Sequence, residues 1–266
     1  MRQVALALAD GAVVAKRNLI KIKRVPEVLI WTTMSPIMFV LLFAYVFGSS
    51  IEIPGVNYRE YLIAGIFAQT VIFGSTFTGA GLAEDMTKGI IDRFRSLPMA
   101  RSAVLVGRTG SDIFYNSTSI LVMSITGLLV GWRIRTGLVE AIGGFLLLLL
   151  FAYAISWIMA YVGLKVSNVE VVNNASFMFI MPMTFIANTF VWSDALPGPL
   201  QTFAEWNPVS SVAQAAREAF GNTGSLPSPD VWSLNNPFLY TIICVGVILA
   251  IFVPLSVRQY NKATTH

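Results

Sequence analysis

Long apolar runs separated by short polar segments dominate the pattern of this chain. A helix needs about 20 apolar residues to cross roughly 30 Å of hydrocarbon, because each residue adds about 1.5 Å. Six runs qualify, and Pro182 interrupts the fifth: residues 28–48, 61–83, 113–132, 138–163, 174–192 and 238–257. The pattern predicts an all-α integral membrane protein with six transmembrane helices in a single domain, residues 1–266.

The segment before the first run also follows a helical period. Apolar and charged side chains fall on opposite sides: Leu8, Ala12, Ala15, Leu19 and Ile22 against Asp10, Arg17, Lys21 and Arg24. A basic amphipathic segment of this kind is typical of a helix that lies in the membrane interface. We expect an interfacial helix over residues 1–25 that ends near Pro26, with a disordered basic leader as the alternative.

Residues 84–99 form a charged segment between two apolar runs. Read as one helix, they have an apolar and a polar face: Met86, Ile90, Ile91, Phe94 and Leu97 against Glu84, Lys88, Asp92 and Arg95. Glu84 and Lys88 are an i,i+4 pair of opposite charge, and Pro98 ends the helix. The charge keeps this helix at the water boundary, where it either rests on lipid or binds a soluble partner. Spacing alone leaves both open.

The connection over residues 193–237 is long and rich in proline. An Asn207-Pro208 turn is followed by hydroxyl N-cap residues, Ser210 and Ser211, and by a stretch that ends at Gly221. We expect a short, re-entrant-like external helix with an apolar face that dips into the outer interface, with a loose loop as the alternative. We further expect this helix to cap the outer end of a transport pathway. The residues expected to form the cap are Trp206, Asn207, Pro208 and Phe220.

Basic residues are distributed unevenly about the predicted helices. Fourteen of the 18 Lys and Arg residues precede the first run, follow the sixth, or lie between the second and third or the fourth and fifth. Because cytoplasmic segments carry an excess of Lys and Arg, both termini and residues 84–99 are expected in the cytoplasm. The expected location is the cell membrane, with residues 193–237 outside.

Composition excludes several function classes. With 55% hydrophobic residues, 12% charged residues and a mean hydropathy of +0.69, the chain is too apolar for an ordinary soluble domain. One cysteine, Cys244, and one histidine, His266, exclude a zinc site built from these residue types and histidine-based catalysis within the spans. The basic residues flank apolar runs, so no nucleic acid is expected as a partner.

The sequence offers no site for ATP or a metal ion. No G-x-x-x-x-G-K-[ST] loop occurs, so ATP must bind another chain. The carboxylates of Glu84, Asp85 and Asp92 could suggest a metal site, but the basic residues among them favour helix-stabilising pairs. The absence of Lys or Arg at mid-depth in the predicted spans argues against an ion-coupled carrier.

Uncharged polar side chains do occur in the predicted spans: Gln69, Thr76, Asn116, Ser119 and Asn188. Their ordinary role is hydrogen bonding between helices. The alternative is that they line a substrate path. The sequence leaves both open.

One motif indicates a family. Residues 84–99 read E-D-x-x-x-G-x-x-x-R-F-R-S-L-P-M, and an external N-P-V-S segment precedes the last apolar run. With the basic leader and the six runs, this pattern resembles the ABC-2 type permeases, especially the daunorubicin-resistance-type efflux permeases, over essentially the whole chain. Residues 93–99 are its most specific part.

The resemblance implies a non-catalytic permease subunit of an ATP-binding cassette exporter. A separate cassette ATPase, in two copies, would hold ATP and Mg, and a second permease copy or a close homologue would complete a dimer in membrane lipid. The cargo would be a hydrophobic or amphipathic compound, such as a drug, a lipid or a lipid-linked glycan, moved out of the cytoplasm or inner leaflet. A membrane-embedded lipid-modifying enzyme and a purely structural subunit are the competing interpretations.

The resemblance also implies which residues couple the ATPase to the spans. In the segment 84–99 these are Glu84, Asp85, Ile90, Ile91, Arg93, Phe94, Arg95 and Leu97. In the leader they are Arg17, Lys21 and Arg24.

Overall fold

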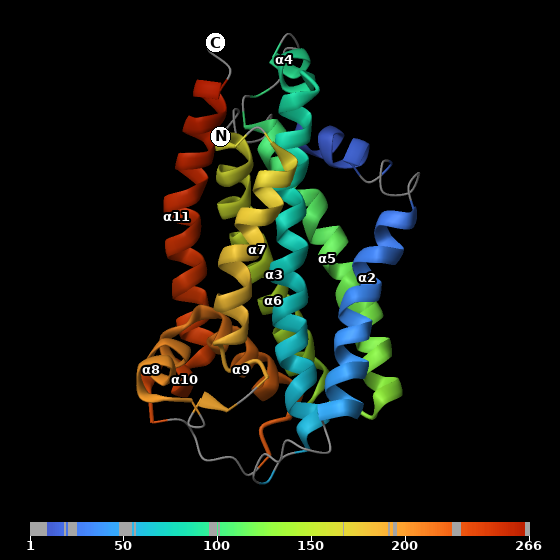
Figure 1. Ribbon diagram of the computed structural model, residues 1–266, viewed down its shortest axis with the longest axis vertical. Coiled ribbons are helices and arrows are strands. Elements are labelled where there is room, and N and C mark those ends of the chain that lie inside the picture. The colour runs from blue at the N-terminus through green and yellow to red at the C-terminus, as the bar shows by residue number, and fades with distance from the viewer. Residues whose placement is uncertain are drawn as a thin grey trace.

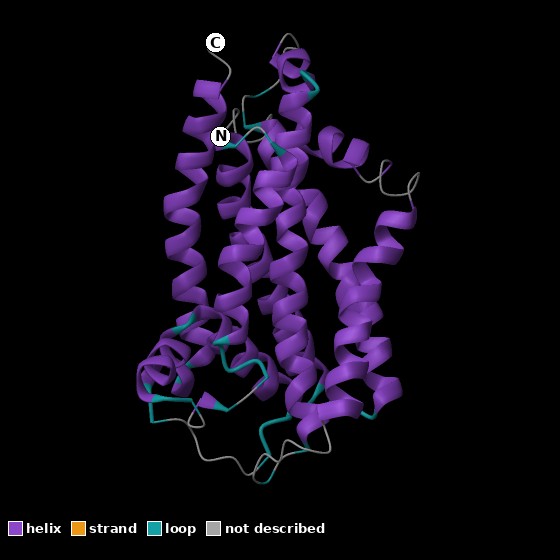
Figure 2. Cartoon of the chain, in the orientation of Figure 1, coloured by secondary structure: helices purple, strands orange, loops and turns teal. Residues whose placement is uncertain are grey.

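The computed structural model describes residues 10–18, 20, 26–47, 55, 57–95, 100, 102–166, 168–190, 192–193, 196–224 and 230–263. Every regular element among these residues is a helix, and the longest helices run side by side as a bundle (Figure 1, Figure 2). The all-α prediction is confirmed for the described part of the chain.

Helix α3, Tyr58–Thr87, forms the centre of the bundle. Its side chains are buried along most of its length, where it packs on α6 (Leu138–Lys165), α5 (Ala103–Val130) and α7 (Val169–Phe185). Small residues make this contact close: a Cβ atom at Gly163 of α6 would lie 2.2 Å from the carbonyl oxygen of Gly79. Close backbone approach is how helices associate in lipid, where the hydrophobic effect gives little attraction between them.

Within the described part of the chain, four helices are long and apolar enough to cross a membrane. They are α3, α5, α6 and α11, the last of which runs over Pro237–Ala263. They match four of the six predicted spans, although α5 ends at Val130, before the predicted end at residue 132. Helix α5 begins at Ala103, well before the predicted start at residue 113, because α3 provides contacts for the polar side chains of its first turns.

The two remaining predicted spans fall on shorter helices. Helix α2, Pro26–Leu41, continues directly into a π-helical segment, Leu42–Phe47. Helix α7 has 17 residues and starts earlier than predicted, because the Asn168 side chain accepts from the backbone N–H groups of Glu170 and Val171. The prediction that this helix reaches residue 192 is wrong: residues 186–190 form turns instead.

The two ends of the bundle differ in structure. One end holds the helical residues 10–18, the short helix α4 (Ile90–Arg95) and the C-terminal end of α11 (Figure 1). The opposite end holds α8 (Gly198–Trp206), α9 (Pro208–Phe220) and α10 (Trp232–Asn235). A leader helix is thus present over residues 10–18, and its predicted extension over residues 1–9 and 21–25 lies outside the described residues.

The predicted external helix is α9, with two corrections. Its N-cap is Asn207, whose side chain accepts from the Val209 N–H, and not Ser210 or Ser211; it does end at Gly221, as expected. Its apolar face is also covered by the chain itself, because all its side chains except those of Pro208 and Glu218 are buried against α3, α6 and α11. The helix is therefore an internal part of the bundle.

Candidate functional site

The predicted coupling segment is an elbow rather than a single helix. Helix α3 continues through Glu84 and Asp85 to Thr87, and α4 begins at Ile90. Between them Gly89 has a φ of +63°, a left-handed conformation that favours glycine. The prediction of one helix over residues 84–99 is therefore wrong. Residues 96–99, which include Leu97, lie outside the described residues.

The apolar side of α4 packs on the bundle. Ile91 is 4% exposed and belongs to a cluster with Leu82 of α3 and Leu105 of α5, which extends to α6 and α11. Phe94 packs against the same cluster. Since this side is covered by the chain's own helices, Ile91 is not available to a soluble partner.

The polar side of α4 is accessible. Asp92 and Arg93 are exposed, Ile90 is half-buried, and Arg95 is the last residue of the helix. Of the predicted coupling residues in α4 whose side chains the structure describes, Arg93 is therefore the most accessible. On α3, the predicted pair is present: Lys88 Nζ lies 2.6 Å from Glu84 Oε1, and this hydrogen bond raises the pKa of Lys88.

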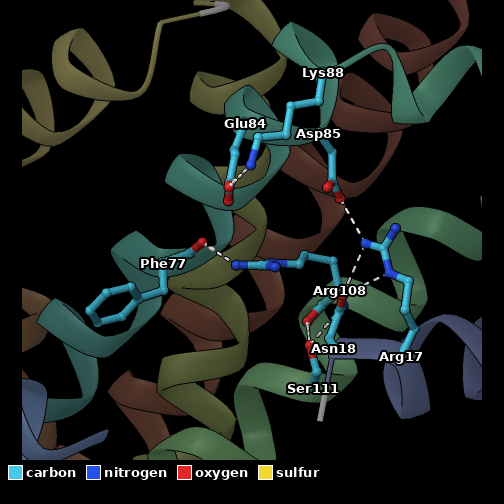
Figure 3. Close-up of polar contacts among 8 residues, drawn as sticks. All are labelled: Arg17, Asn18, Phe77, Glu84, Asp85, Lys88, Arg108 and Ser111. Carbon is cyan, nitrogen blue, oxygen red and sulfur yellow. Dashed lines mark hydrogen bonds and ion pairs between the residues drawn. The ribbon is translucent and has the colours of Figure 1, made fainter. Parts of the chain in front are cut away.

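Arg17 of the leader joins the elbow to the bundle (Figure 3). Its Nη2 lies 2.8 Å from Asp85 Oδ2 on α3, and its guanidinium lies 4.9 Å from the centre of the Phe94 ring on α4. Next to it, Asn18 Nδ2 donates to Ser111 Oγ on α5 over 3.2 Å. We call these five residues the Arg17 joint. The structure thus brings together three residues predicted for coupling, whereas Lys21 and Arg24 lie outside the described residues.

The leader crosses α5 in close contact. A Cβ atom at Gly107 would lie 2.5 Å from the Gly11 carbonyl oxygen, and Asp10 Oδ2 accepts from the Ala100 N–H over 2.9 Å. The leader helix is therefore fixed to the bundle at several points. Because of these contacts, we expect it to move together with α3, α4 and α5.

A cavity of about 510 Å³ lies among α2, α3, α5 and α7. Its wall is largely apolar and aromatic: Phe39, Phe73, Phe77, Tyr115, Phe177 and Met181. Gln69, Thr76 and Ser119 add polar groups, and these are three of the five residues predicted as a possible path. An apolar cavity with a few polar groups is the usual form of a site for small molecules.

The other two predicted path residues lie outside the cavity lining. Asn116 sits directly behind the wall, since a Cβ atom at the lining residue Gly74 would lie 2.2 Å from Asn116 Oδ1. Asn188 lies in the turn after α7, where its side chain and carbonyl oxygen accept from Arg217 of α9. The prediction that Asn188 belongs to a span is wrong.

Arg217 is the residue that sequence reasoning placed least well. It belongs to the connection over residues 193–237, which was predicted to lie outside the membrane, yet its side chain is 0% exposed. Its guanidinium lies 3.6 Å from the centre of the Tyr61 ring and donates four hydrogen bonds, to the Tyr61, Asn188 and Thr189 carbonyls and to Asn188 Oδ1. Its position four residues after Ala213, on the apolar face of α9, is the signal that could have indicated its burial.

The predicted external residues have different environments. Phe220 is buried in an aromatic cluster with Phe67, Trp132 and Phe145. Asn207 Nδ2 also donates to the Met183 carbonyl oxygen over 2.7 Å, which ties the start of α9 to α7. Trp206, in contrast, is 50% exposed. Phe220 and Asn207 therefore anchor α9 to the other helices at its end of the bundle.

The described residues contain no group of three or more His, Cys, Asp or Glu side chains that could hold a metal ion. What they contain is a cavity lined by α2, α3, α5 and α7 and, at one end, an elbow fixed to the leader. This arrangement suits binding and movement of a molecule.

Comparison with known proteins identifies the family. The protein-family model described as "ABC-2 type transporter" matches residues 11–220 of the chain. The chain is 31% identical over 251 residues to the daunorubicin resistance ABC transporter permease protein DrrB1 of Streptomyces coeruleorubidus, covering 94% of this chain and 85% of that protein. It is 27% identical over 232 residues to the probable doxorubicin resistance ABC transporter permease protein DrrC of Mycobacterium tuberculosis, covering 87% and 80%.

A more distant relative is the putative transport permease ycf38 of Cyanophora paradoxa, 22% identical over 227 residues, or 84% of this chain and 78% of that protein. The family model and the DrrB1 match both extend over most of the sequence. They confirm the resemblance found in the motif of residues 84–99. The chain therefore belongs to the ABC-2 type transporter family.

Proposed function

We propose that this chain is the transmembrane permease subunit of an ABC exporter that moves a hydrophobic or amphipathic compound out of the cytoplasm or inner leaflet. A separate cassette ATPase, in two copies with bound ATP and Mg, powers it. A second copy of the chain, or a close homologue, completes the transporter. Family membership and the drug-resistance names of the relatives support this proposal.

We propose a topology of six spans with both termini in the cytoplasm. The helices α3, α5, α6 and α11 are four of them, α2 with its π-helical extension is the first span, and the short α7 is the fifth. The end with α4 is then cytoplasmic. Basic residues gathered at this end support the orientation, since Arg17, Lys88 and Arg93 all lie there.

The Arg17 joint is the observation that carries the coupling role. An ATPase that binds the exposed side of α4 also pulls on α3 through the elbow and on the leader through Arg17. Because α3 contacts most of the other helices, displacement of its end shifts the balance between inward-open and outward-open arrangements. The cavity among α2, α3, α5 and α7 is the proposed cargo site.

Reconstitution into liposomes tests this function. The permease is co-expressed with the cassette ATPase that co-purifies with it, and uptake of daunorubicin is followed by its fluorescence. Uptake is expected only with ATP and both proteins present. Turnover of lipid by the permease alone would favour the lipid-modifying enzyme, and ATP hydrolysis by the purified permease alone would contradict the proposal.

A further inference from the structure

Buried polar atoms without a hydrogen-bond partner gather at one level of the bundle, beside the cavity. Within the described part of the chain, Thr78 Oγ1, Asp112 Oδ2, Ser156 Oγ and both amide atoms of the Asn116 side chain are in this condition. All four residues are 5% exposed or less. Buried polar atoms in folded proteins are nearly always bonded, so such a concentration indicates a place where a ligand binds. We call these four residues the polar node.

The contacts between α3 and α5 place Thr78 opposite Asp112. The two helices are antiparallel. Gly74 of α3 faces Asn116 of α5, and further along α3, Gly81 faces the earlier residue Arg108 of α5. Thr78 is one turn after Gly74, and Asp112 is one turn before Asn116. The register therefore brings Thr78 and Asp112 to the same level of the bundle.

Helix α6 contributes the third side of the node. It runs parallel to α3, with Ser75 Oγ donating to the Ala152 carbonyl oxygen over 2.9 Å, and with the Met159 carbonyl oxygen close to Gly79. Ser156 lies between these two contacts. Ser156 and Arg108 both interact electrostatically with the Asp112 carboxyl, although Asp112 Oδ2 and Ser156 Oγ have no hydrogen-bond partner in the structure.

Helix α5 carries two charged side chains near the node, and Asp112 lies nearer along the helix to the cavity residue Ser119 than Arg108 does. Arg108, Asp112 and Asn116 follow at intervals of one turn, about 5.4 Å, and Ser119 of the cavity wall comes next. Arg108 Nη2 donates to the Phe77 carbonyl oxygen over 2.6 Å, with its side chain extended across to α3 (Figure 3). Asn116, directly behind the cavity wall at Gly74, is therefore the node residue next to the cavity, and Asp112 and then Arg108 follow it along α5.

Resting on the proposed export function, we propose that the polar node is the subsite that selects the charge of the cargo. It receives a protonated amine, whose N–H groups donate to Asp112 Oδ2, Asn116 Oδ1 and the hydroxyl oxygens, while the apolar or aromatic body of the cargo lies in the cavity. A buried carboxylate attracts a cation and disfavours an anion. The preferred cargo is thus an amphipathic cation, and Asp112 is the residue that determines this specificity.

A matched pair of fluorescent ligands tests the proposal. Monodansylcadaverine carries a primary ammonium group, and its N-acetyl derivative has the same ring system without the charge. Binding of each to the purified permease–ATPase complex is measured by dansyl fluorescence. The wild-type protein is expected to bind the amine more tightly, and Asp112→Asn is expected to lower its affinity for the amine about tenfold or more while changing that for the acetylated ligand little.

Two further variants make the test decisive. Asn116→Asp adds a second carboxylate one turn nearer the cavity, with Asp112 still present, and is expected to increase the preference for the amine. It therefore tests the proposal even where Asp112→Asn folds poorly. Glu140→Gln neutralises an exposed carboxylate at the start of α6 and is expected to change neither affinity.

Equal binding of both ligands by the wild-type protein, or equal loss of both in Asp112→Asn, would overturn the proposal. So would a preference for the amine that Asn116→Asp leaves unchanged or lowers. ATP-dependent uptake by the reconstituted complex is measured separately, so failure of the charge selection is distinct from failure of the export function.

Discussion

The Arg17 joint makes a quantitative prediction about the pair of Arg17 and Asp85. The side chains are 38% and 8% exposed, so Asp85 depends on Arg17 far more than Arg17 depends on Asp85. Arg17→Ala removes a hydrogen bond between charged groups, worth about 1.5–3 kcal/mol, and leaves a buried carboxylate without its partner. It also removes a cation–π contact with Phe94 of about 0.5–1 kcal/mol at this partly exposed site.

A double-mutant cycle isolates the pair. Arg17→Ala alone is expected to lower the free energy of unfolding by about 2–3 kcal/mol, since both contacts are lost and solvent compensates part of the charge. In Arg17→Ala with Asp85→Ala the uncompensated carboxylate is gone, so the loss is expected to be smaller than the two single losses added together. The expected coupling free energy is about 1–2 kcal/mol.

The assay has two readouts. Unfolding in SDS, followed by tryptophan fluorescence, gives the free energies, and pull-down of the co-expressed ATPase gives its affinity. If the joint holds the elbow for the ATPase, Arg17→Ala weakens association about tenfold, which corresponds to 1.4 kcal/mol. Single losses that add within about 0.5 kcal/mol, together with unchanged ATPase affinity, would show that the joint carries no coupling.

Three other predictions concern topology, the buried arginine and the elbow. In a Cys244→Ser background, Lys88→Cys is expected to resist a membrane-impermeant maleimide in intact cells while Asn235→Cys reacts, and the reverse pattern would invert the topology. Arg217→Met leaves buried carbonyl groups unsatisfied and is expected to lower the unfolding free energy, measured by SDS titration, by about 3 kcal/mol or more. Arg217→Lys is expected to recover only part of this loss, and full recovery would show that charge alone matters. A Cβ atom at Gly89 meets nothing within 4 Å, so Gly89→Ala should lower stability only by the left-handed backbone strain, about 1 kcal/mol. It should also reduce ATP-driven uptake, because relief of this strain lets α4 straighten onto α3. Unchanged stability and uptake would argue against a fixed elbow.

The sequence predicted the parts of the fold that follow from local pattern. Apolar length identified the cores of α3, α5, α6 and α11, and the αL cap at Gly221 followed from residue type. The helical period of the leader likewise held over residues 10–18. These features are determined within a few turns of chain.

The sequence did not predict features that depend on distant contacts. Burial of Arg217 requires the carbonyl groups of the turn after α7, which come to α9 only in the folded bundle. The early start of α5 requires α3 as a partner for Arg108, which donates to the Phe77 carbonyl oxygen. The period of residues 84–99 predicted one helix through Gly89, whereas the bend there depends on packing of Ile91 on the bundle.

Site-specific photo-crosslinking at residue 93 tests the central claim most directly. A photoreactive amino acid replaces the exposed Arg93 of α4, and the same replacement at the exposed Asn235 at the opposite end of the bundle serves as the control. With the cassette ATPase co-expressed, irradiation is expected to link it to the permease at position 93 and not at position 235. A crosslink to the ATPase at position 235, or none at position 93 in a complex that still transports, would contradict the assignment of α4 as the coupling element.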